Sequence, residues 1–342
     1  MVNTKKNIAR AHHYVPQFYL AGFTSSGSKK ATLYVHDLLQ LKTWTSTPAG
    51  AGHKNDFYRI NHPDIAPDEI ERFLGGIEAQ AAKVIRQIVT TNKLPEGEEF
   101  QILLHFIGLM AIRVPSVRDA HAHFEKESAQ KILQLVANLP DEELKGQIAA
   151  LNAALNDEAI KNGEEPLGEL TPDDLRQFVQ SKEYEIDVTQ NGYMDWFING
   201  LLATLPTLVN ALAARYWVLQ VVDDSAENFI CTDHPVTISY LVPMPAFMEE
   251  SPGFGMPETV VNMPLSRKHA LVGILSDKVP DFPSTTIPVS REMTTITNTI
   301  LAKRAYRFIF SSKPDFIWQK SKGIFCSKDS FFSLLKESRN HS

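Results

Sequence analysis

Residues 96–113 have the sequence EGEEFQILLHFIGLMAIR, in which apolar side chains occupy most positions from Phe100 onward. A helix that is apolar nearly all round its circumference is normally buried on every side. We therefore expect this segment to form a central, buried helix. Pro115 should end or kink it, because proline cannot continue the hydrogen-bond ladder of a helix.

Helical patterns continue on both sides of this segment. Upstream, apolar residues recur at three- and four-residue spacings from Pro67 to about Thr91, which predicts an amphipathic helix. Downstream, Ser116 and Thr171 are placed to cap helices. Helices are predicted there at residues 116–139, from 141 onward, at 171–181 and at 194–214. The acidic stretch 156–169 is expected to be a solvated loop.

Segments with strand character lie before and after the helical region. Residues 32–36 and 56–60 are rich in Thr, Tyr, Val and Ile, which predicts an N-terminal antiparallel sheet. Further strands are predicted at residues 216–222, 228–239, 269–275 and 304–310. The predicted fold class is α+β, with a central, mostly helical layer over 68–214, short N-terminal strands and a C-terminal, mainly antiparallel sheet. We expect residues 1–342 to form a single integrated domain, with an acidic helical or loop insertion at 141–187.

The charge of the chain is unevenly distributed. Residues 141–187 contain 13 acidic and four basic side chains, a charge of −9, whereas the whole chain has a formal net charge of −6. The remaining residues therefore sum to +3. The overall sign does not exclude a nucleic-acid partner, although the sequence lacks the dense basic patch of a dedicated nucleic-acid-binding protein.

Cysteine usage and hydropathy favour a cytoplasmic protein. The two cysteines, Cys231 and Cys326, are far apart and lack a Cys-x-x-Cys spacing, so neither a disulfide framework nor a thiolate zinc site is indicated. The basic N-terminus is not followed by the apolar run of an export signal, because His12 and His13 interrupt it. The most apolar window, 201–222, is broken within the roughly 20 residues that a membrane span needs, so we expect core and no membrane.

Two adjacent histidines, His12 and His13, are the first candidate for a functional site. Adjacent residues of an extended chain point to opposite faces, unless the backbone is kinked, as the nearby Pro16 would allow. Neutral imidazole is a common metal ligand and a ready general base, so the pair could supply both functions. The alternative is structural: one ring bonds a buried carbonyl and the other faces solvent.

Asp233 and His234 form a second candidate, at the end of a predicted strand and before Pro235. A carboxylate and an imidazole at a strand end can serve a site, or Asp233 can simply cap local amides in a turn.

Glu78 and Arg113 form a third candidate for a functional site. Glu78 lies at the edge of the apolar stripe of its helix, where it needs a partner, and Arg113 is the obvious cation. The pair is either structural or a fork for a phosphate or carboxylate.

Several motifs together resemble one family, the bacterial domain of unknown function 4238. They are residues 12–20 (HHYVPQFYL, which contains an HHYVP motif) with Phe23, Asp56-Phe57-Tyr58, Glu78, Arg113-Val114-Pro115, Thr232-Asp233-His234-Pro235-Val236 and Pro264-Leu265-Ser266. The resemblance covers residues 11–310. The family pattern has Ser before Asp233 and often Asn after it, so Thr232 keeps the hydroxyl whereas His234 departs from the pattern. The resemblance implies candidate positions but no activity, because the family has none assigned.

The leading functional hypothesis is a cytoplasmic hydrolase that acts on a phosphate-containing or nucleic-acid substrate. Standard motifs of zinc proteases, phosphate-binding loops, α/β-hydrolases and dinucleotide-binding folds are missing from the sequence. The predicted catalytic residues are His12, His13, Asp233, Arg113 and Glu78, and the predicted ligands of a divalent metal are His12, His13, Asp233 and His234. The alternative is a noncatalytic ligand- or partner-binding protein of a bacterial defence or toxin-related system, in which the His-His motif is structural. The substrate, the metal and the oligomeric state stay open.

Overall fold

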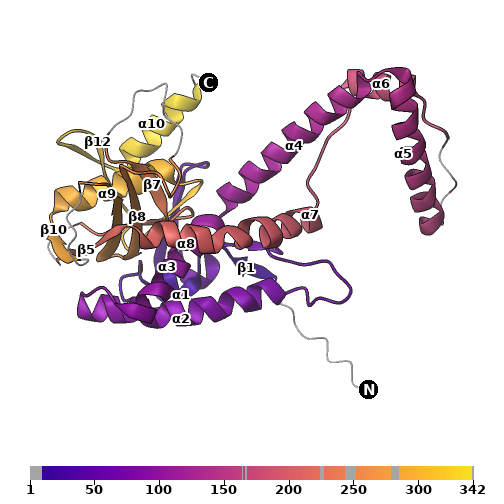
Figure 1. Ribbon diagram of the computed structural model, residues 1–342. Helices are drawn as coiled ribbons and strands as arrows, with labels where there is room; N and C mark the ends of the chain where they lie inside the picture. The colour runs from indigo at the N-terminus through magenta and orange to yellow at the C-terminus, as the bar shows by residue number, and fades with distance from the viewer. Residues whose placement is uncertain are drawn as a thin grey trace. The chain divides into compact units, whose positions relative to one another are not determined.

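The computed structural model describes residues 10–163, 165, 168–223, 227–242, 252–278 and 285–340. The chain divides into two compact units: residues up to Val117 together with those from Met194 form the first, and Arg118–Tyr193 form the second. Long helices combined with several small sheets confirm the α+β fold class (Figure 1). The single integrated domain stays a prediction.

The buried helix expected at 96–113 is α3 (Gly97–Ile112), in which every residue from Phe106 to Ile112 is buried. It contacts α2 (Glu69–Thr91), whose buried side chains repeat at helical spacing as predicted, and α8 (Leu205–Ala213). The helix expected at 194–214 is less regular than predicted. Its first part consists of α7 (Gln190–Asp195), a π-helical segment η2 (Trp196–Leu201) and a 3₁₀ turn η3 (Leu202–Thr204).

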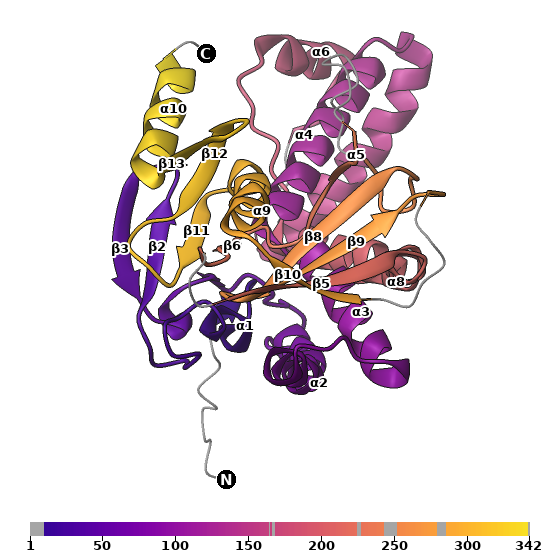
Figure 2. The same cartoon turned by 90° about the vertical axis from the view of Figure 1, so that its left-hand side faces the viewer.

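A five-stranded sheet has the order β10-β5-β9-β8-β7 and is antiparallel except for the β10–β5 pair. Its strands are β5 (Tyr216–Val222), β7 (Thr237–Tyr240), β8 (Thr259–Ser266), β9 (His269–Leu275) and β10 (Thr285–Val289). Successive residues of β5 face opposite sides. Trp217 donates from Nε1 to the Leu212 carbonyl of α8, whereas Gln220 accepts from Thr297 of α9 (Arg291–Arg304). Helices therefore cover both faces of this sheet (Figure 2).

A second sheet joins the two ends of the chain. It has the order β3-β2-β11-β6, formed by β2 (Leu33–Asp37), β3 (Lys42–Ser46), β6 (Cys231–Thr232) and β11 (Phe308–Ser311). The strand predicted at 228–239 is wrong as one element. It is two strands, β6 and β7, in two different sheets, because the turn at Asp233-His234-Pro235 separates them. Strand β8 and helix α9 were not predicted.

Shorter elements complete the first unit. Strand β1 (Ala11–His13) pairs with β4 (His53–Asn55), and α1 (Gln17–Ala21) follows Pro16. The strand predicted at 56–60 is wrong, because Asp56 adopts a positive φ of 56° that ends the extended chain. A hairpin of β12 (Ile317–Ser321) and β13 (Ile324–Ser327) leads into α10 (Lys328–Asn340). These C-terminal elements share a core with Leu38 and Ile309.

The second unit is helical in the part that the structure describes. It contains α5 (Asp141–Asn162), α6 (Pro172–Ser181) and most of α4 (Pro115–Ala137). Thr171 caps α6 in the predicted capping box with Asp174. The solvated loop predicted at 156–169 is wrong in its first half, because α5 continues to Asn162 and ends at Gly163, whose φ is 74°.

Among the described residues, Gln190–Ala213 is long and apolar enough to cross a membrane, and 17% of its most apolar window is buried. The bent pair Gly97–Ile112 and Pro115–Ala137 passes the same test if it is taken as one span. These findings rest on length and composition alone, and a core helix of a soluble protein passes the same test.

Gly273 leaves space for the largest buried side chain of the five-stranded sheet. It lies opposite Trp217 in the β5–β9 register, and a Cβ on Gly273 would lie 2.8 Å from the nearest carbon of the indole ring. The ring cannot move away freely, because its Nε1 donates to the Leu212 carbonyl at 2.9 Å. A side chain at position 273 is therefore incompatible with the native position of Trp217.

We predict that Gly273→Ala lowers the free energy of unfolding by about 1–3 kcal/mol, the usual effect of overpacking a core. Gly75→Ala is the matched control, because Gly75 lies inside α2 and a Cβ added there would have no neighbouring atom within 4 Å. It should be neutral or stabilising by up to about 1 kcal/mol, since Ala is the better helix former. Urea denaturation of both variants measures the difference, and equal stabilities would contradict the packing argument.

Candidate functional site

The two histidines of the HHYVP motif are both buried, and both bond to the backbone. His12 accepts a hydrogen bond at Nδ1 from the Tyr58 amide at 2.9 Å, and its ring is stacked on the Tyr58 ring. His13 bonds through Nε2 to the Ala49 carbonyl at 3.3 Å and packs against His53, with 5.2 Å between ring centroids. Burial, followed by the neighbouring His53, lowers the pKa of His13 to about 4. Neither ring faces solvent, contrary to the structural alternative for one of them.

Arg113 is completely buried at the C-terminal end of α3. It donates from Nη1 to Glu78 Oε1 at 2.7 Å, from Nε to the Tyr58 hydroxyl at 3.3 Å, and from Nη2 to the His13 carbonyl. Burial alone would lower the pKa of Arg113, but the interactions with Tyr58 and Glu78 outweigh it and raise the pKa. The ion pair expected between Glu78 and Arg113 is thus confirmed.

Glu71 is a half-buried carboxylate near this network that sequence reasoning missed. Burial raises its pKa, and Arg113 and His12 oppose the shift. Its Oε2 is buried with no hydrogen-bond partner in the part of the chain that the structure describes. Glu71 stands one turn before Leu74 on α2, so its place on the buried side of the helix was the available signal.

Asp233 and His234 have partners of their own, in other elements. Asp233 accepts three backbone hydrogen bonds, from Tyr306, Arg307 and Phe308, at 2.8–2.9 Å. Burial raises the pKa of Asp233 to about 6, and these hydrogen bonds oppose the shift. His234 Nδ1 lies 3.2 Å from the Ser116 hydroxyl. Asp233 therefore caps amides, as the structural alternative proposed, but these amides lie far away in sequence.

The predicted residues separate into two groups. His12, His13, Glu78 and Arg113 meet around Tyr58, whereas Asp233 and His234 bond elsewhere. Within the described ranges, no three or more His, Cys, Asp or Glu side chains are arranged to hold a metal ion. His12, His13, Asp233 and His234 all belong to those ranges, so they do not fit the metal site predicted from them. The catalytic roles stay predictions.

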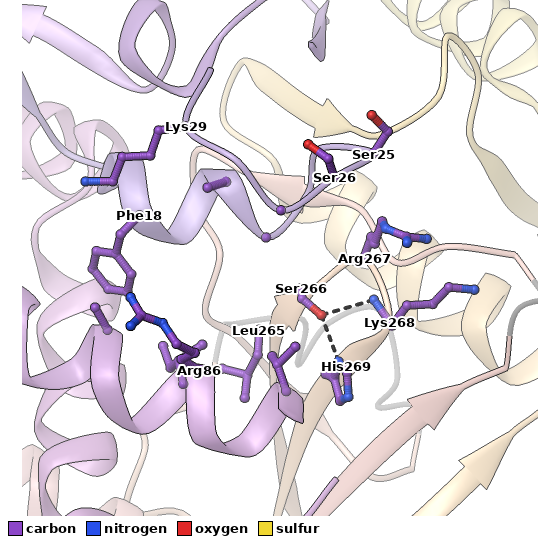
Figure 3. Close-up of a pocket in the computed structure, with 16 residues that line it drawn as sticks. Phe18, Ser25, Ser26, Lys29, Arg86, Leu265, Ser266, Arg267, Lys268 and His269 are labelled. Carbon is purple, nitrogen blue, oxygen red and sulfur yellow. Dashed lines mark hydrogen bonds between the residues drawn. The ribbon is translucent and has the colours of Figure 1, made fainter. Parts of the chain in front are cut away.

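A different part of the first unit contains a pocket of about 470 Å³ (Figure 3). Three segments line it: α1 with the loop that follows, the second half of α2, and the tight turn between β8 and β9. Its apolar wall is formed by Phe18, Ala21, Ala82, Ile85, Val89 and Leu265. Its polar lining consists of Ser25, Ser26, Lys29, Arg86, Ser266, Arg267, Lys268 and His269. This volume falls in the range of small-molecule sites.

The pocket lining carries positive charge without a carboxylate. Lys29, Arg86 and Arg267 make no ion pair with any described residue, and no Asp or Glu lines the pocket. Lys268 donates from Nζ to the Asp223 carbonyl at 2.7 Å. The uncompensated charges of Lys29, Arg86 and Arg267 favour an anion.

Two residues of the pocket lining, Ser266 and His269, form a hydrogen-bonded chain with Asn92. Ser266 Oγ is 2.8 Å from His269 Nδ1, and His269 Nε2 is 2.7 Å from Asn92 Oδ1. Ser266 and His269 end β8 and begin β9, so a two-residue turn places them side by side. Asn92 adopts a φ of 54° as the C-cap of α2, a position that suits asparagine. Burial, and then Lys268, lowers the pKa of His269 to about 4.

The pocket was missing from the sequence-based hypotheses. Ser266 belonged to a quoted motif, but Lys29, Arg86, Arg267 and His269 were not singled out. The available signal was the run of three basic or titratable residues at 267–269 directly after Ser266. Its meaning depends on α2 and the loop after α1 lying beside the turn, which spacing in the sequence does not reveal.

Comparison with known proteins identifies a family and no function. The model of a family described as "Protein of unknown function (DUF4238)" matches residues 11–315. No curated protein and no solved structure matches the chain.

We predict that Arg113→Met lowers the free energy of unfolding by about 3–5 kcal/mol, because it leaves Glu78, the Tyr58 hydroxyl and the His13 carbonyl without their partner. Arg72→Met is the matched control, since Arg72 forms exposed ion pairs with Asp68 and Glu69 on α2. It should change stability by less than about 1 kcal/mol. Chemical denaturation followed by circular dichroism compares the two. A small effect of Arg113→Met would mean that the network does not stabilise the fold.

Acid should destabilise the protein between about pH 6.5 and pH 4. Burial lowers the pKa values of His13, His36 and His269 to about 4, so in this window the unfolded chain binds protons that the folded chain does not. Asp233, with its pKa raised to about 6, and Glu71, whose pKa burial also raises, act in the opposite direction. His121 and His234, whose pKa values burial lowers, add to the effect of the three histidines, which therefore prevails. We expect a net loss of a few kcal/mol on going from pH 7 to pH 5, at about 1.4 kcal/mol per unit of pKa difference.

Urea denaturation at pH 7, 6 and 5 measures this loss. His36→Gln should reduce the dependence on pH, because His36 is fully buried between Thr43 and Ser311 and lies outside the pocket. A protein that is equally stable at pH 5 and pH 7 would show that these rings are not held neutral.

Proposed function

The chain belongs to the family described as "Protein of unknown function (DUF4238)", and from its pocket we propose that it binds a small phosphate-containing molecule. The observation that carries this proposal is the uncompensated charge of Lys29, Arg86 and Arg267 around one cavity. Guanidinium groups bind phosphate oxygens through paired N–H donors, and such charge-assisted hydrogen bonds are stronger than neutral ones. A phosphate would supply the missing counter-charge.

The apolar wall narrows the class of ligand. Phe18 and Ile85 line the same cavity as the cations, and Phe18 and Arg86 are labelled in Figure 3. Sites of this kind bury the apolar part of a ligand and orient it through a few polar groups. A phosphate joined to a flat or apolar group, as in a nucleotide, therefore fits better than a free inorganic ion. The hydroxyls of Ser25 and Ser26 add hydrogen-bonding capacity at the rim.

The proposal keeps the substrate class of the leading hypothesis but changes the residues that recognise it. The predicted anion stabiliser, Arg113, is completely buried and already paired with Glu78, whereas Arg86 lies exposed at the pocket. A cytoplasmic location is part of the proposal, because both Cys231 and Cys326 are free thiols and nucleotides are abundant inside cells. A nucleic-acid strand is the competing ligand, because it presents the same phosphate chemistry.

Isothermal titration calorimetry with ATP, pyrophosphate and adenosine tests this function. We expect ATP and pyrophosphate to bind, and adenosine to bind at least about tenfold more weakly than ATP. Arg86→Gln and Arg267→Gln should each weaken ATP binding about tenfold, since a hydrogen bond to a charged group contributes about 1.5–3 kcal/mol. Lys83→Gln is the matched control, because Lys83 is exposed on α2 but does not line the pocket.

Two results would overturn the proposal. Failure of both ATP and pyrophosphate to bind in low salt removes the phosphate site. Tighter binding of a 20-nucleotide single strand than of ATP, with an equal effect of Lys83→Gln and Arg86→Gln, would indicate a nucleic-acid surface in place of a small-molecule pocket.

A further inference from the structure

Ser266, His269 and Asn92 are arranged as a nucleophile, a base and an orienting group. Ser266 Oγ and His269 Nδ1 are 2.8 Å apart, and Asn92 Oδ1 is 2.7 Å from the other ring nitrogen. These are the distances at which a base takes a proton from a hydroxyl. Both Ser266 and His269 are about 5% exposed, and both line the cavity.

The hydrogen-bond directions fit a base at His269. The amide oxygen of Asn92 can only accept, so His269 Nε2 carries the proton and His269 Nδ1 has its lone pair free. That lone pair faces the Ser266 hydroxyl, which donates to it. Figure 3 shows the hydroxyl directed at His269 and also accepting from the Lys268 backbone N–H, at 3.1 Å. The backbone bond fixes the position of the oxygen while its proton stays on the histidine side.

We propose that Ser266 is a nucleophile, activated by His269 as general base and oriented through Asn92, that hydrolyses a carboxylic ester of a phosphate-bearing molecule. The phosphate part of this substrate class rests on the proposed function, because Arg86 and Arg267 would hold it. The ester part rests on the hydroxyl–imidazole–amide chain, which has the order of nucleophile, base and orienting group found in acyl-transfer enzymes, with an amide in place of their more usual carboxylate.

The proposed hydrolysis consumes the ester and one water molecule and needs no other reagent. Ser266 Oγ attacks the ester carbonyl carbon while its proton passes to His269 Nδ1. The bond between that carbon and the alcohol oxygen then breaks, and His269 returns the proton to the departing alcohol. Water, deprotonated by His269 in the same way, attacks the acyl-serine, releases the carboxylic acid and restores the Ser266 hydroxyl.

The surroundings of His269 set its protonation state. Burial lowers its pKa to about 4, so the imidazole is neutral at neutral pH and its Nδ1 lone pair is available, while the low pKa also makes it a weak base. The wall of the pocket contains Lys29, Arg86 and Arg267 and no carboxylate, so its charge favours a negatively charged substrate. The same Ser266–Lys268 contact also stabilises the turn, so the experiment has to separate nucleophilic from structural behaviour.

Labelling with a fluorophosphonate–rhodamine probe makes this separation. The oxygen of an activated serine attacks the phosphorus of the probe and displaces fluoride. Mass spectrometry of the labelled peptide then locates the modified residue in the unaltered protein. We expect the label on Ser266, its loss in Ser266→Ala, and labelling at least about 100-fold slower in His269→Gln, which removes the base. Ser338→Ala is the matched control, because Ser338 is exposed on α10, outside the pocket, and its hydroxyl donates to the Leu335 carbonyl; this variant should be labelled like the unaltered protein. Hydrolysis of p-nitrophenyl acetate should follow the same order.

The outcomes distinguish this inference from the proposed function. No label on Ser266, or equal labelling of Ser25, Ser26 and Ser266, overturns the nucleophile even where ATP binds. Label on Ser266 that saturating pyrophosphate does not slow, in a protein that binds no ATP, confirms the nucleophile and overturns the phosphate site. If Ser266→Ala lowers the melting temperature and the unaltered protein carries no label, the hydroxyl acts only in the turn.

Discussion

The buried guanidinium of Arg113 is the constraint on which the arrangement of the N-terminal segment depends. A charge without access to solvent must be satisfied completely, and here Glu78, Tyr58 and the His13 carbonyl do so from three different segments. The Tyr58 hydroxyl in turn donates to the Arg113 carbonyl, and the Tyr58 amide bonds His12. Strand β1, the turn at 56–58, α2 and the end of α3 are thereby held together by one network.

A second buried group, the Asp233 carboxylate, holds segments of the second sheet together in a similar way. The Asp233 carboxylate accepts the amides of residues 306–308, at the end of β6 and the start of β11. Strand β11 pairs with β2 on its other side, and Arg307 reaches Asp37 at 2.7 Å. Further along the chain, Arg267 donates its amide to the Gly22 carbonyl, so the β8–β9 turn is fixed beside the loop after α1. The pocket forms where α2 lies next to this turn and to the loop after α1.

Elements that depend on local periodicity could be predicted, and contacts between distant segments could not. The apolar run after Phe100 predicted α3, and a lone carboxylate on the stripe of α2 predicted the pairing of Glu78 with Arg113. The prediction of one strand across Asp233 was wrong, because the sequence does not show which sheet each half joins. The pocket was not predicted for the same reason, because its lining comes from segments that are far apart in the sequence. His269 and Asn92 are 177 positions apart, and their hydrogen bond has no signature in spacing.

The residues that mark the family and the residues that line the pocket are therefore largely different sets with different physical tasks. His12, His13 and Arg113 are buried and bonded to the backbone, and such groups make a fold specific whatever its chemistry. Ser266 belongs to the family motifs and also lines the cavity, where its hydroxyl forms a hydrogen bond with His269. A dense motif of histidine, proline and tyrosine is thus a poor guide to the reacting atoms when its side chains are fully satisfied. Uncompensated charge beside a cavity is the better guide, because unlike a satisfied network it requires a partner from outside the chain.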